Sequence, residues 1–352
     1  MMTDEVLFCV SENGVATITL NRPKALNSLT YDMLIAIGDK LKEWAADDHI
    51  QVVVMKGAGT KGFCAGGDIK SLYEAASSQD AMHQAEHFFE VEYQVDQMIY
   101  TYEKPIIACL DGIVMGGGVG LTYGARHKIV TERTKWAMPE MNIGFFPDVG
   151  AAYFLNKAPG HIGRYLAMTA TVIQAQDVIY IHGADVYMTS ESMQSFLAHL
   201  EQVEWELNNA DATLNQLLHE HSEKPAQESE LPLLQKQIDH YFSFEKVEEI
   251  ICACEKDQSD FARTTKETLL SKSPASLKIT LKQLTEGKLK SLSDCFATDL
   301  VLANNFLRHR DFFEGVRSVL IDKDQEPLYM YRSLADVSEE MVESFFERSI
   351  KK

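Results

Sequence analysis

Two glycine-rich stretches of the chain are suited to binding a negatively charged oxygen. One lies within residues 63–69 (Phe-Cys-Ala-Gly-Gly-Asp-Ile), and the other is the triplet at 116–118, which follows the apolar run 106–110. Consecutive glycines are unfavourable inside a strand or helix, because each loses much backbone entropy on ordering. They are favourable where a strand turns abruptly into a helix, whose first N–H groups are unpaired. The repeated pattern predicts two backbone N–H groups that face one oxyanion. The alternative is a pair of plain turns without a ligand.

Two carboxylates lie in an apolar segment that follows these glycines. Glu140 comes after Pro139, and Asp148 stands eight residues later, beyond the apolar residues 143–147. A glutamate in a loop is usually a surface residue, but the apolar setting favours a chemical role. Two acids close together in such a setting cannot both ionise easily, so one is expected to have a raised pKa suited to proton transfer.

Other common ligand motifs are absent from the sequence. It contains no phosphate-binding loop, no complete dinucleotide fingerprint, no Gly-x-Ser-x-Gly elbow and no His-Glu-x-x-His pair. The six cysteines form no Cys-x-x-Cys pair, and Cys64 and Cys109 have apolar neighbours, so buried reduced thiols are expected. We therefore expect neither a metal site nor a serine nucleophile.

The composition limits the partners of this chain. Thirty-three basic residues stand against 52 acidic ones, a net charge of −19 over 352 residues. Such a surface repels nucleic acid and anionic membranes in general, although a local basic pocket can still bind an anion. No run approaches the roughly 18 apolar residues of a membrane span. The acidic N-terminus shows no leader, which predicts a cytoplasmic location.

The hydrophobic pattern alternates between strands and helices in the first half of the chain. Runs 6–10 and 15–20 predict a hairpin through Asn13-Gly14, and 52–55 predicts a buried strand. Helices are expected at 29–44 with Thr30 as N-cap, and further along at 80–102, 160–170 and 175–180. This alternation indicates an α/β fold with a largely parallel sheet. After about residue 190 the pattern becomes helical and charged.

Several ordered motifs resemble the crotonase (enoyl-CoA hydratase/isomerase) superfamily, and within it the 3-hydroxyisobutyryl-CoA hydrolase branch. They lie at 20–27, 63–69, 111–120, 138–150 and 313–324, and only 190–270 matches poorly. The resemblance implies a crotonase-like spiral of ββα units at residues 1–190 and a helical C-terminal region at 191–352. A homo-oligomer is left open.

The resemblance also implies the roles of individual residues. The N–H groups of Gly67 and Gly117 correspond to the family's oxyanion hole, which polarises a thioester carbonyl. Lys24 or Lys61 would meet phosphates of coenzyme A. The positions that correspond to substrate-binding residues are Glu92, Gly66, Asp68, Gly116, Lys24, Ala25 and Leu26.

One departure from the hydratases of the family points to a different reaction. Hydratases carry a glutamate where this chain has Gly120; Glu140 keeps their second acid, and Asp148 stands where they usually have glycine. The resemblance thus implies hydrolysis of a short 3-hydroxyacyl-CoA, such as the 3-hydroxyisobutyryl-CoA of valine catabolism. Glu140 would act as general base or as nucleophile, and Asp148 would orient water or the 3-hydroxyl group and take part in proton transfer.

Two other functions stay open at this point. One is an enoyl-CoA hydratase or isomerase, which Gly120 argues against. The other is a non-catalytic acyl-CoA-binding protein, which the retained Glu140 and Asp148 argue against. In each case the partner is an acyl-CoA, and no separate cofactor is expected because coenzyme A is part of the substrate.

Overall fold

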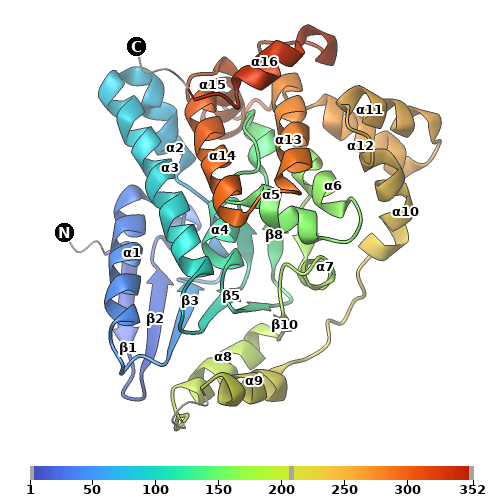
Figure 1. The fold of residues 1–352 in the computed structure, drawn as a ribbon. Coiled ribbons are helices and arrows are strands. Elements are labelled where there is room, and N and C mark those ends of the chain that lie inside the picture. Colours follow the sequence, from blue (N-terminus) through green and yellow to red (C-terminus); the bar gives the residue numbers. More distant parts are fainter. Residues whose placement is uncertain (1–3, 206–209, 349–352) are drawn as a thin grey trace. The chain divides into compact units, whose positions relative to one another are not determined.

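The computed structural model describes residues 4–205 and 210–348 (Figure 1). The chain divides into two compact units. Unit 1 comprises Met1–Gly67, Gln94–Trp136 and Ile173–Ser229, and unit 2 comprises Asp68–Tyr93, Ala137–Val172 and Glu230–Lys352. The division predicted at residue 190 rests on the change of sequence pattern and not on contacts. After that residue the described elements are all helical.

A six-stranded sheet forms the centre of unit 1. Its strands, in spatial order, are β1 (Val6–Val10), β2 (Val15–Leu20), β3 (Val52–Gly57), β5 (Ile106–Leu110), β7 (His127–Val130) and β10 (Val186–Tyr187). The β1–β2 hairpin is antiparallel, and every other neighbouring pair is parallel. All five residues of β5 are buried, as expected of a parallel strand that is covered on both faces. The predicted hairpin and the largely parallel sheet are confirmed.

Helix α1 (Tyr31–Ala45) begins where the sequence predicts. The Thr30 hydroxyl accepts a hydrogen bond from the Met33 N–H at 3.3 Å, so Thr30 is the N-cap. The buried side chains recur at helical spacing, and Trp44 contacts Phe8 of β1 edge to face, with ring centroids 5.8 Å apart. The apolar stripe read from the sequence is therefore the face that packs on the sheet.

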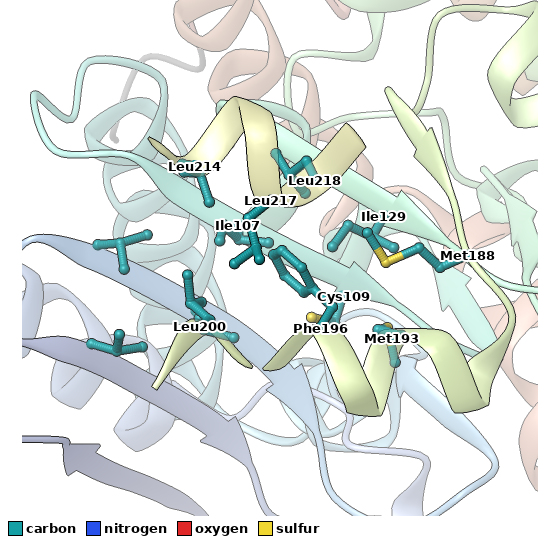
Figure 2. Packing of buried hydrophobic residues seen from close by; sticks show 13 residues of the cluster. Ile107, Cys109, Ile129, Met188, Met193, Phe196, Leu200, Leu214, Leu217 and Leu218 are labelled. Atoms are coloured by element: carbon teal, nitrogen blue, oxygen red, sulfur yellow. The ribbon is translucent and has the colours of Figure 1, made fainter. Parts of the chain in front are cut away.

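Helices α8 (Ser190–Leu200) and α9 (Ala210–His221) cover the sheet of unit 1 with leucines, one phenylalanine and one methionine (Figure 2). Phe196 and Leu200 of α8 belong to the same buried cluster as Ile107 and Ile129 of the sheet strands and Leu217 of α9. Fully burying such a side chain contributes roughly 1.5–3 kcal/mol. The segment after residue 190 therefore begins by completing the core of unit 1.

A second, smaller sheet was not predicted from the sequence. It has four strands in the order β4 (Gly62–Cys64), β6 (Ile113–Met115), β8 (Lys135–Ala137) and β9 (Ile173–Gln174). Strands β4 and β6 pair in parallel, and each leads into one of the glycine-rich stretches. Two short helices complete unit 1: α4 (Gly117–Tyr123) and α7 (Ala175–Tyr180). The predicted helix at 175–180 is confirmed, and α4 begins at the glycine triplet as expected.

Unit 2 is helical. Its helices are α2 (Ile69–Tyr73), α5 (Ala151–Phe154), α6 (Ile162–Thr169), α10 (Leu231–Phe242), α11 (Val247–Lys256), α12 (Asp260–Leu270), α13 (Pro274–Gly287), α14 (Leu292–Phe306), α15 (Arg310–Val316) and α16 (Glu339–Ser344). Helix α3 (Gln79–Tyr100) starts in unit 2 and ends in unit 1. Helix α13 packs on α5 and α6, and α14 also packs on α5 (Figure 1). No helix within 4–205 or 210–348 is long and apolar enough to cross a membrane.

Short turns of other helical types complete the described chain. They are η1 (Pro23–Ala25), η2 (Glu74–Ser77), η3 (Glu140–Ile143), η4 (Leu155–Lys157), the π-helical turn η5 (Arg317–Ile321) and η6 (Leu334–Asp336). Asp68 stands at the N-cap position of α2, but its side chain makes no capping hydrogen bond to that helix.

Candidate active site

In unit 1 the two glycine-rich stretches approach each other directly. Gly66 has φ +96°, a conformation that favours glycine, and a Cβ at this position would lie 3.0 Å from the Met115 carbonyl oxygen and 3.2 Å from the Gly117 nitrogen. A Cβ at Gly118 would lie 2.5 Å from the carbonyl oxygen of Cys64. Only glycines allow this contact between the ends of β4 and β6, so the two glycine-rich turns adjoin.

The two predicted donor groups have no hydrogen-bond partner within the part of the chain that the structure describes. Gly117 is the first residue of α4, where an N–H has no partner within the helix. Among the residues that the structure describes, neither the Gly67 N–H nor the Gly117 N–H donates a hydrogen bond. Gly116, with φ 53° and ψ −122°, makes the turn between β6 and α4. Two free amides on adjoining turns are suited to binding one oxyanion.

The segment 24–26, predicted to bind coenzyme A, adjoins the same turns. Leu26, with φ 52°, ends the short turn η1 that contains Lys24 and Ala25. The Ala65 N–H donates to the Leu26 carbonyl at 3.0 Å, and the Leu29 N–H donates to the Gly66 carbonyl at 2.8 Å. The structure thus brings Lys24, Ala25 and Leu26 together with Gly66 in unit 1. Lys24 and Lys61 are exposed, as a residue that meets phosphates must be.

Asn27 is a structural residue of this segment that the sequence reasoning did not single out. Its side chain is 1% exposed and donates to the carbonyls of Ala58 and Gly62, at 3.0 and 2.9 Å. Its Oδ1 accepts a hydrogen bond from the Arg22 N–H at 2.9 Å. Asn27 therefore fixes the loop that carries Lys24 to the end of β3 and the start of β4.

The two predicted carboxylates interact in unit 2. Glu140 opens the turn η3 after Pro139, and Asp148 follows in the loop before α5. Both are buried, 8% and 5% exposed. Burial raises the pKa of Glu140 well above its usual range, and the neighbouring Asp148 raises it further. Oε2 of Glu140 is buried without a hydrogen-bond partner among the described residues, which leaves this atom available to a proton.

Asp148 has a partner of its own. The Tyr93 hydroxyl donates to Oδ2 of Asp148 at 2.6 Å, which favours the charged form. Burial is the larger effect and raises the pKa of Asp148 to about 7. Burial, together with the charge of Asp148, also raises the pKa of Tyr93, so the phenol stays protonated and remains a donor. A pair of buried carboxyl groups with raised pKa values is suited to proton transfer.

Aromatic side chains cluster in the segment between the two carboxylates and beside Tyr93, the partner of Asp148. Phe145 stacks on Phe89 with centroids 5.6 Å apart, and it lies 4.6 Å from Phe146 and 5.3 Å from Phe306. Phe296 lies 5.9 Å from Tyr93. These rings supply the apolar surroundings that the sequence between 143 and 147 suggested. They explain why desolvation dominates the pKa of both acids.

The remaining predicted residues lie in unit 2. Glu92 is 2% exposed on α3 and contributes to the raised pKa of Tyr93, so it is not a surface helix residue. Asp68 is half-buried at the start of α2. Of the predicted set, the structure therefore groups Glu92, Glu140 and Asp148 within one unit, and Gly66, Gly67, Gly116 and Gly117 with the segment at Lys24 within the other.

Three polar residues near Asp148 were missed by the sequence reasoning: Tyr93, Gln283 and Asp299. The signal for Asp299 is its place on the buried face of α14, where it shares helical spacing with Phe296, Leu302 and Ala303. A carboxylate on an apolar stripe is unusual enough to be flagged. Tyr93 adjoins Glu92 in the chain, but nothing local indicates its bond to a residue 55 positions away.

Comparisons with known proteins agree on the family. A family model described as enoyl-CoA hydratase/isomerase matches residues 15–346. The chain is 42% identical over 356 residues to 3-hydroxyisobutyryl-CoA hydrolase, mitochondrial, of Danio rerio, with 99% of this chain and 91% of that protein covered. It is 36% identical over 336 residues to small ribosomal subunit protein mS47 of Neurospora crassa, with 91% and 66% covered.

A solved structure of similar sequence shares the fold. The carnitinyl-CoA dehydratase from Mycobacterium thermoresistibile superposes with a TM-score of 0.89 at 34% identity, covering 98% of this chain and 97% of that one. The match extends through the helical C-terminal region as well as the sheets. These comparisons confirm the predicted fold class, and the chain belongs to the enoyl-CoA hydratase/isomerase (crotonase) family.

Proposed function

We propose that this protein is a thioesterase that hydrolyses a short 3-hydroxyacyl-CoA, with 3-hydroxyisobutyryl-CoA as the first substrate to test. The observation that supports it most is the buried pair of Glu140 and Asp148, combined with Gly120 at the position of the missing hydratase acid. The relative from Danio rerio carries the name of that hydrolase. The reaction adds water to the thioester carbonyl and releases a 3-hydroxy acid and free coenzyme A.

In this proposal the amides and the acids have separate tasks. The N–H groups of Gly67 and Gly117 bind the carbonyl oxygen as it becomes an oxyanion, an interaction worth about 10²–10³ in rate for each donor. Glu140 either takes a proton from the attacking water or attacks the carbonyl itself to form an anhydride, which water then opens. Asp148 orients the water or the 3-hydroxyl group. As the C–S bond breaks, the Glu140–Asp148 pair protonates the departing thiolate, and the attacking water supplies the proton that the pair gives up.

The test compares thioester cleavage with hydration. Release of free thiol from a panel of short acyl-CoA thioesters is measured beside hydration of crotonyl-CoA. We expect thiol release from 3-hydroxyacyl esters, strongest with the 3-hydroxyisobutyryl group, and no hydration, because Gly120 supplies no second glutamate. Hydration without thiol release would favour the hydratase alternative. The similarity to a carnitinyl-CoA dehydratase is the observation that supports this alternative.

A binding protein without turnover is the second alternative, and the similarity to mS47, a protein named as a ribosomal subunit component, is the observation that favours it. Calorimetric titration with acyl-CoA decides this: binding without thiol release from any ester would support a non-catalytic role.

The cytoplasmic location also stays a prediction. The relative from Danio rerio is named as mitochondrial, so cell fractionation with an antibody to this chain is the direct test.

A further inference from the structure

Asp148 lies in a backbone turn that the local sequence does not favour. The next residue, Val149, is fully buried and has φ +52°, although β-branched residues rarely adopt a positive φ. Gly150 follows with φ +80°. Strained conformations of this kind persist only where surrounding contacts hold them, and they concentrate at functional sites. The contacts that hold this turn therefore decide where the Asp148 carboxylate points.

Two side chains from different helices hold the turn on both sides of Asp148. The Gly150 N–H donates to Oδ2 of Asp299 at 2.8 Å. The Gln283 side-chain amide donates to the Pro147 carbonyl at 2.9 Å and to Oδ1 of Asp299 at 2.8 Å. Gln283 on α13 and Asp299 on α14 are both buried, so no solvent competes for these bonds. The backbone is thus fixed one residue before Asp148 and two residues after it.

A carboxylate is a costly residue to bury for this purpose. Burial raises the pKa of Asp299 to about 8, while the bonds from Gly150 and Gln283 oppose that rise. We propose that Asp299 is a positioning residue for Asp148: together with Gln283 it holds the 147–150 turn in the conformation that aims the Asp148 carboxylate at the reacting group. This inference rests on the proposed function, because it gives Asp148 a role in the reaction.

The chain offers a matched control in the same unit. The Gln235 side-chain amide donates to Oδ1 of Asp239 at 2.8 Å and to the Pro159 carbonyl at 3.3 Å. Oδ1 of Asp239 also accepts the His161 N–H at 2.7 Å. A glutamine and an aspartate again hold a turn that starts with proline, but this turn carries no acid of the proposed site. Variants of both pairs lose the same kinds of bond.

The test uses the full chain and the thiol-release assay with 3-hydroxyisobutyryl-CoA. Asp299→Leu removes both acceptors, and Gln283→Leu removes the bond to Pro147. We expect each to lower kcat by about 10²-fold, the effect of misplacing a reacting group by about 1 Å, with KM changed less than about threefold. Asp299→Asn keeps an acceptor for the Gly150 N–H and should restore most of the lost kcat. Asp239→Leu and Gln235→Leu should lower the melting temperature but leave kcat within about twofold.

The outcomes separate this inference from the proposed function. Folded Asp299→Leu or Gln283→Leu protein with unchanged kcat, or an equal loss of kcat in the control pair, overturns the positioning role while leaving the thioesterase standing. If Asp299→Leu does not fold, Gln283→Leu decides alone. If the unmodified protein cleaves no thioester, the proposed function fails. Hydrogen exchange at the Gly150 amide then tests whether Gln283 holds the 147–150 turn. Faster exchange in Gln283→Leu but not in Gln235→Leu supports this role, and unchanged exchange overturns it.

Discussion

The Tyr93 hydroxyl donates a 2.6 Å hydrogen bond to Oδ2 of Asp148, and both side chains are buried. The bond is made from a phenol whose own pKa is raised by burial, so the donor does not ionise in the pH range where Asp148 titrates. It stabilises the carboxylate against the apolar surroundings. The pKa of Asp148 near 7 is therefore a balance between desolvation, which raises it, and the hydrogen bonds from Tyr93 and from a backbone N–H, which lower it.

Replacing Tyr93 by phenylalanine should shift that balance in a known direction. A hydrogen bond to a charged group is worth about 1.5–3 kcal/mol, so its loss raises the pKa of Asp148 by about one to two pH units. The limb of the kcat/KM profile that follows Asp148 should move to higher pH by that amount in Y93F. The measurement is the pH dependence of thiol release.

The matched control for this variant is Tyr241→Phe. Tyr241 donates to Oδ2 of Asp257 in the same unit, and neither residue belongs to the proposed site. This variant should leave the pH profile of kcat/KM unchanged. A profile of Y93F that coincides with that of the unmodified protein would refute the role assigned to the bond.

The buried acids also predict how stability depends on pH. The pKa of Asp148 is about 7 in the folded protein, against about 3.9 in an unfolded chain. The folded state therefore keeps a proton that the unfolded state releases. The stabilising contribution of the protonated acid is fully present below about pH 4 and is lost as pH rises to about 7. A difference of about 3 between the two pKa values corresponds to roughly 4 kcal/mol.

Asp148→Asn removes the cost of burying a charged carboxylate and keeps an acceptor for the Tyr93 hydroxyl. Near pH 7.5 the variant should be more stable than the unmodified protein, and the gain should vanish below about pH 4. The measurement is urea unfolding at several pH values, expressed as the difference between the two proteins. Asp257→Asn serves as the control of opposite sign, because the bond from Tyr241 lowers the pKa of Asp257. A difference for Asp148→Asn that does not vary with pH would contradict the prediction.

Glu140→Gln tests the assigned chemistry most directly. The amide keeps the shape of the side chain but can neither accept the proton of water nor attack the carbonyl, so kcat should fall about 10²–10⁴-fold. Acyl-CoA binding, measured by calorimetry, should be retained. Full activity in the variant would exclude Glu140 from both roles.

A single turnover in ¹⁸O-labelled water separates the two roles of Glu140. As a general base, Glu140 takes a proton from the water, which attacks the substrate carbonyl directly. The label then appears only in the released acid. As a nucleophile it forms an anhydride. Attack of labelled water on the enzyme carbonyl of that anhydride places the label in Glu140 first, where peptide mass spectrometry detects it.

Local features of the sequence predicted those elements that local physics determines. Thr30 and the apolar spacing after it define α1, and the glycine triplet marks the start of α4. The second sheet was missed because its strands are two or three residues long, too short for the period of two to show. A buried carboxylate such as Asp299 can be flagged from its apolar helix face, but the partner of a tertiary hydrogen bond leaves no local signal. Gln283 meets Pro147 across 136 positions, so no window of sequence could indicate the network that holds Asp148.

Gly66→Ala tests the donor pair in unit 1. An alanine at φ +96° is strained, and its Cβ would lie 3.0 Å from the Met115 oxygen and 3.2 Å from the Gly117 nitrogen. Both neighbours are backbone atoms, so the variant must displace the Gly117 amide. Loss of one oxyanion donor costs about 10²–10³ in kcat, and we expect a fall of this order with coenzyme A affinity retained.

The matched control is Gly59→Ala in the same unit. Gly59 has φ +81°, and its Cβ would lie 3.1 Å from Cβ of Pro23, so backbone strain and crowding are similar but no donor amide moves. This variant should lose melting temperature to a similar extent and keep its kcat. If G66A folds and keeps its kcat, or if the two variants lose kcat equally, then the approach of Gly66 to Gly117 serves only the packing of β4 against α4, and the oxyanion must be bound elsewhere.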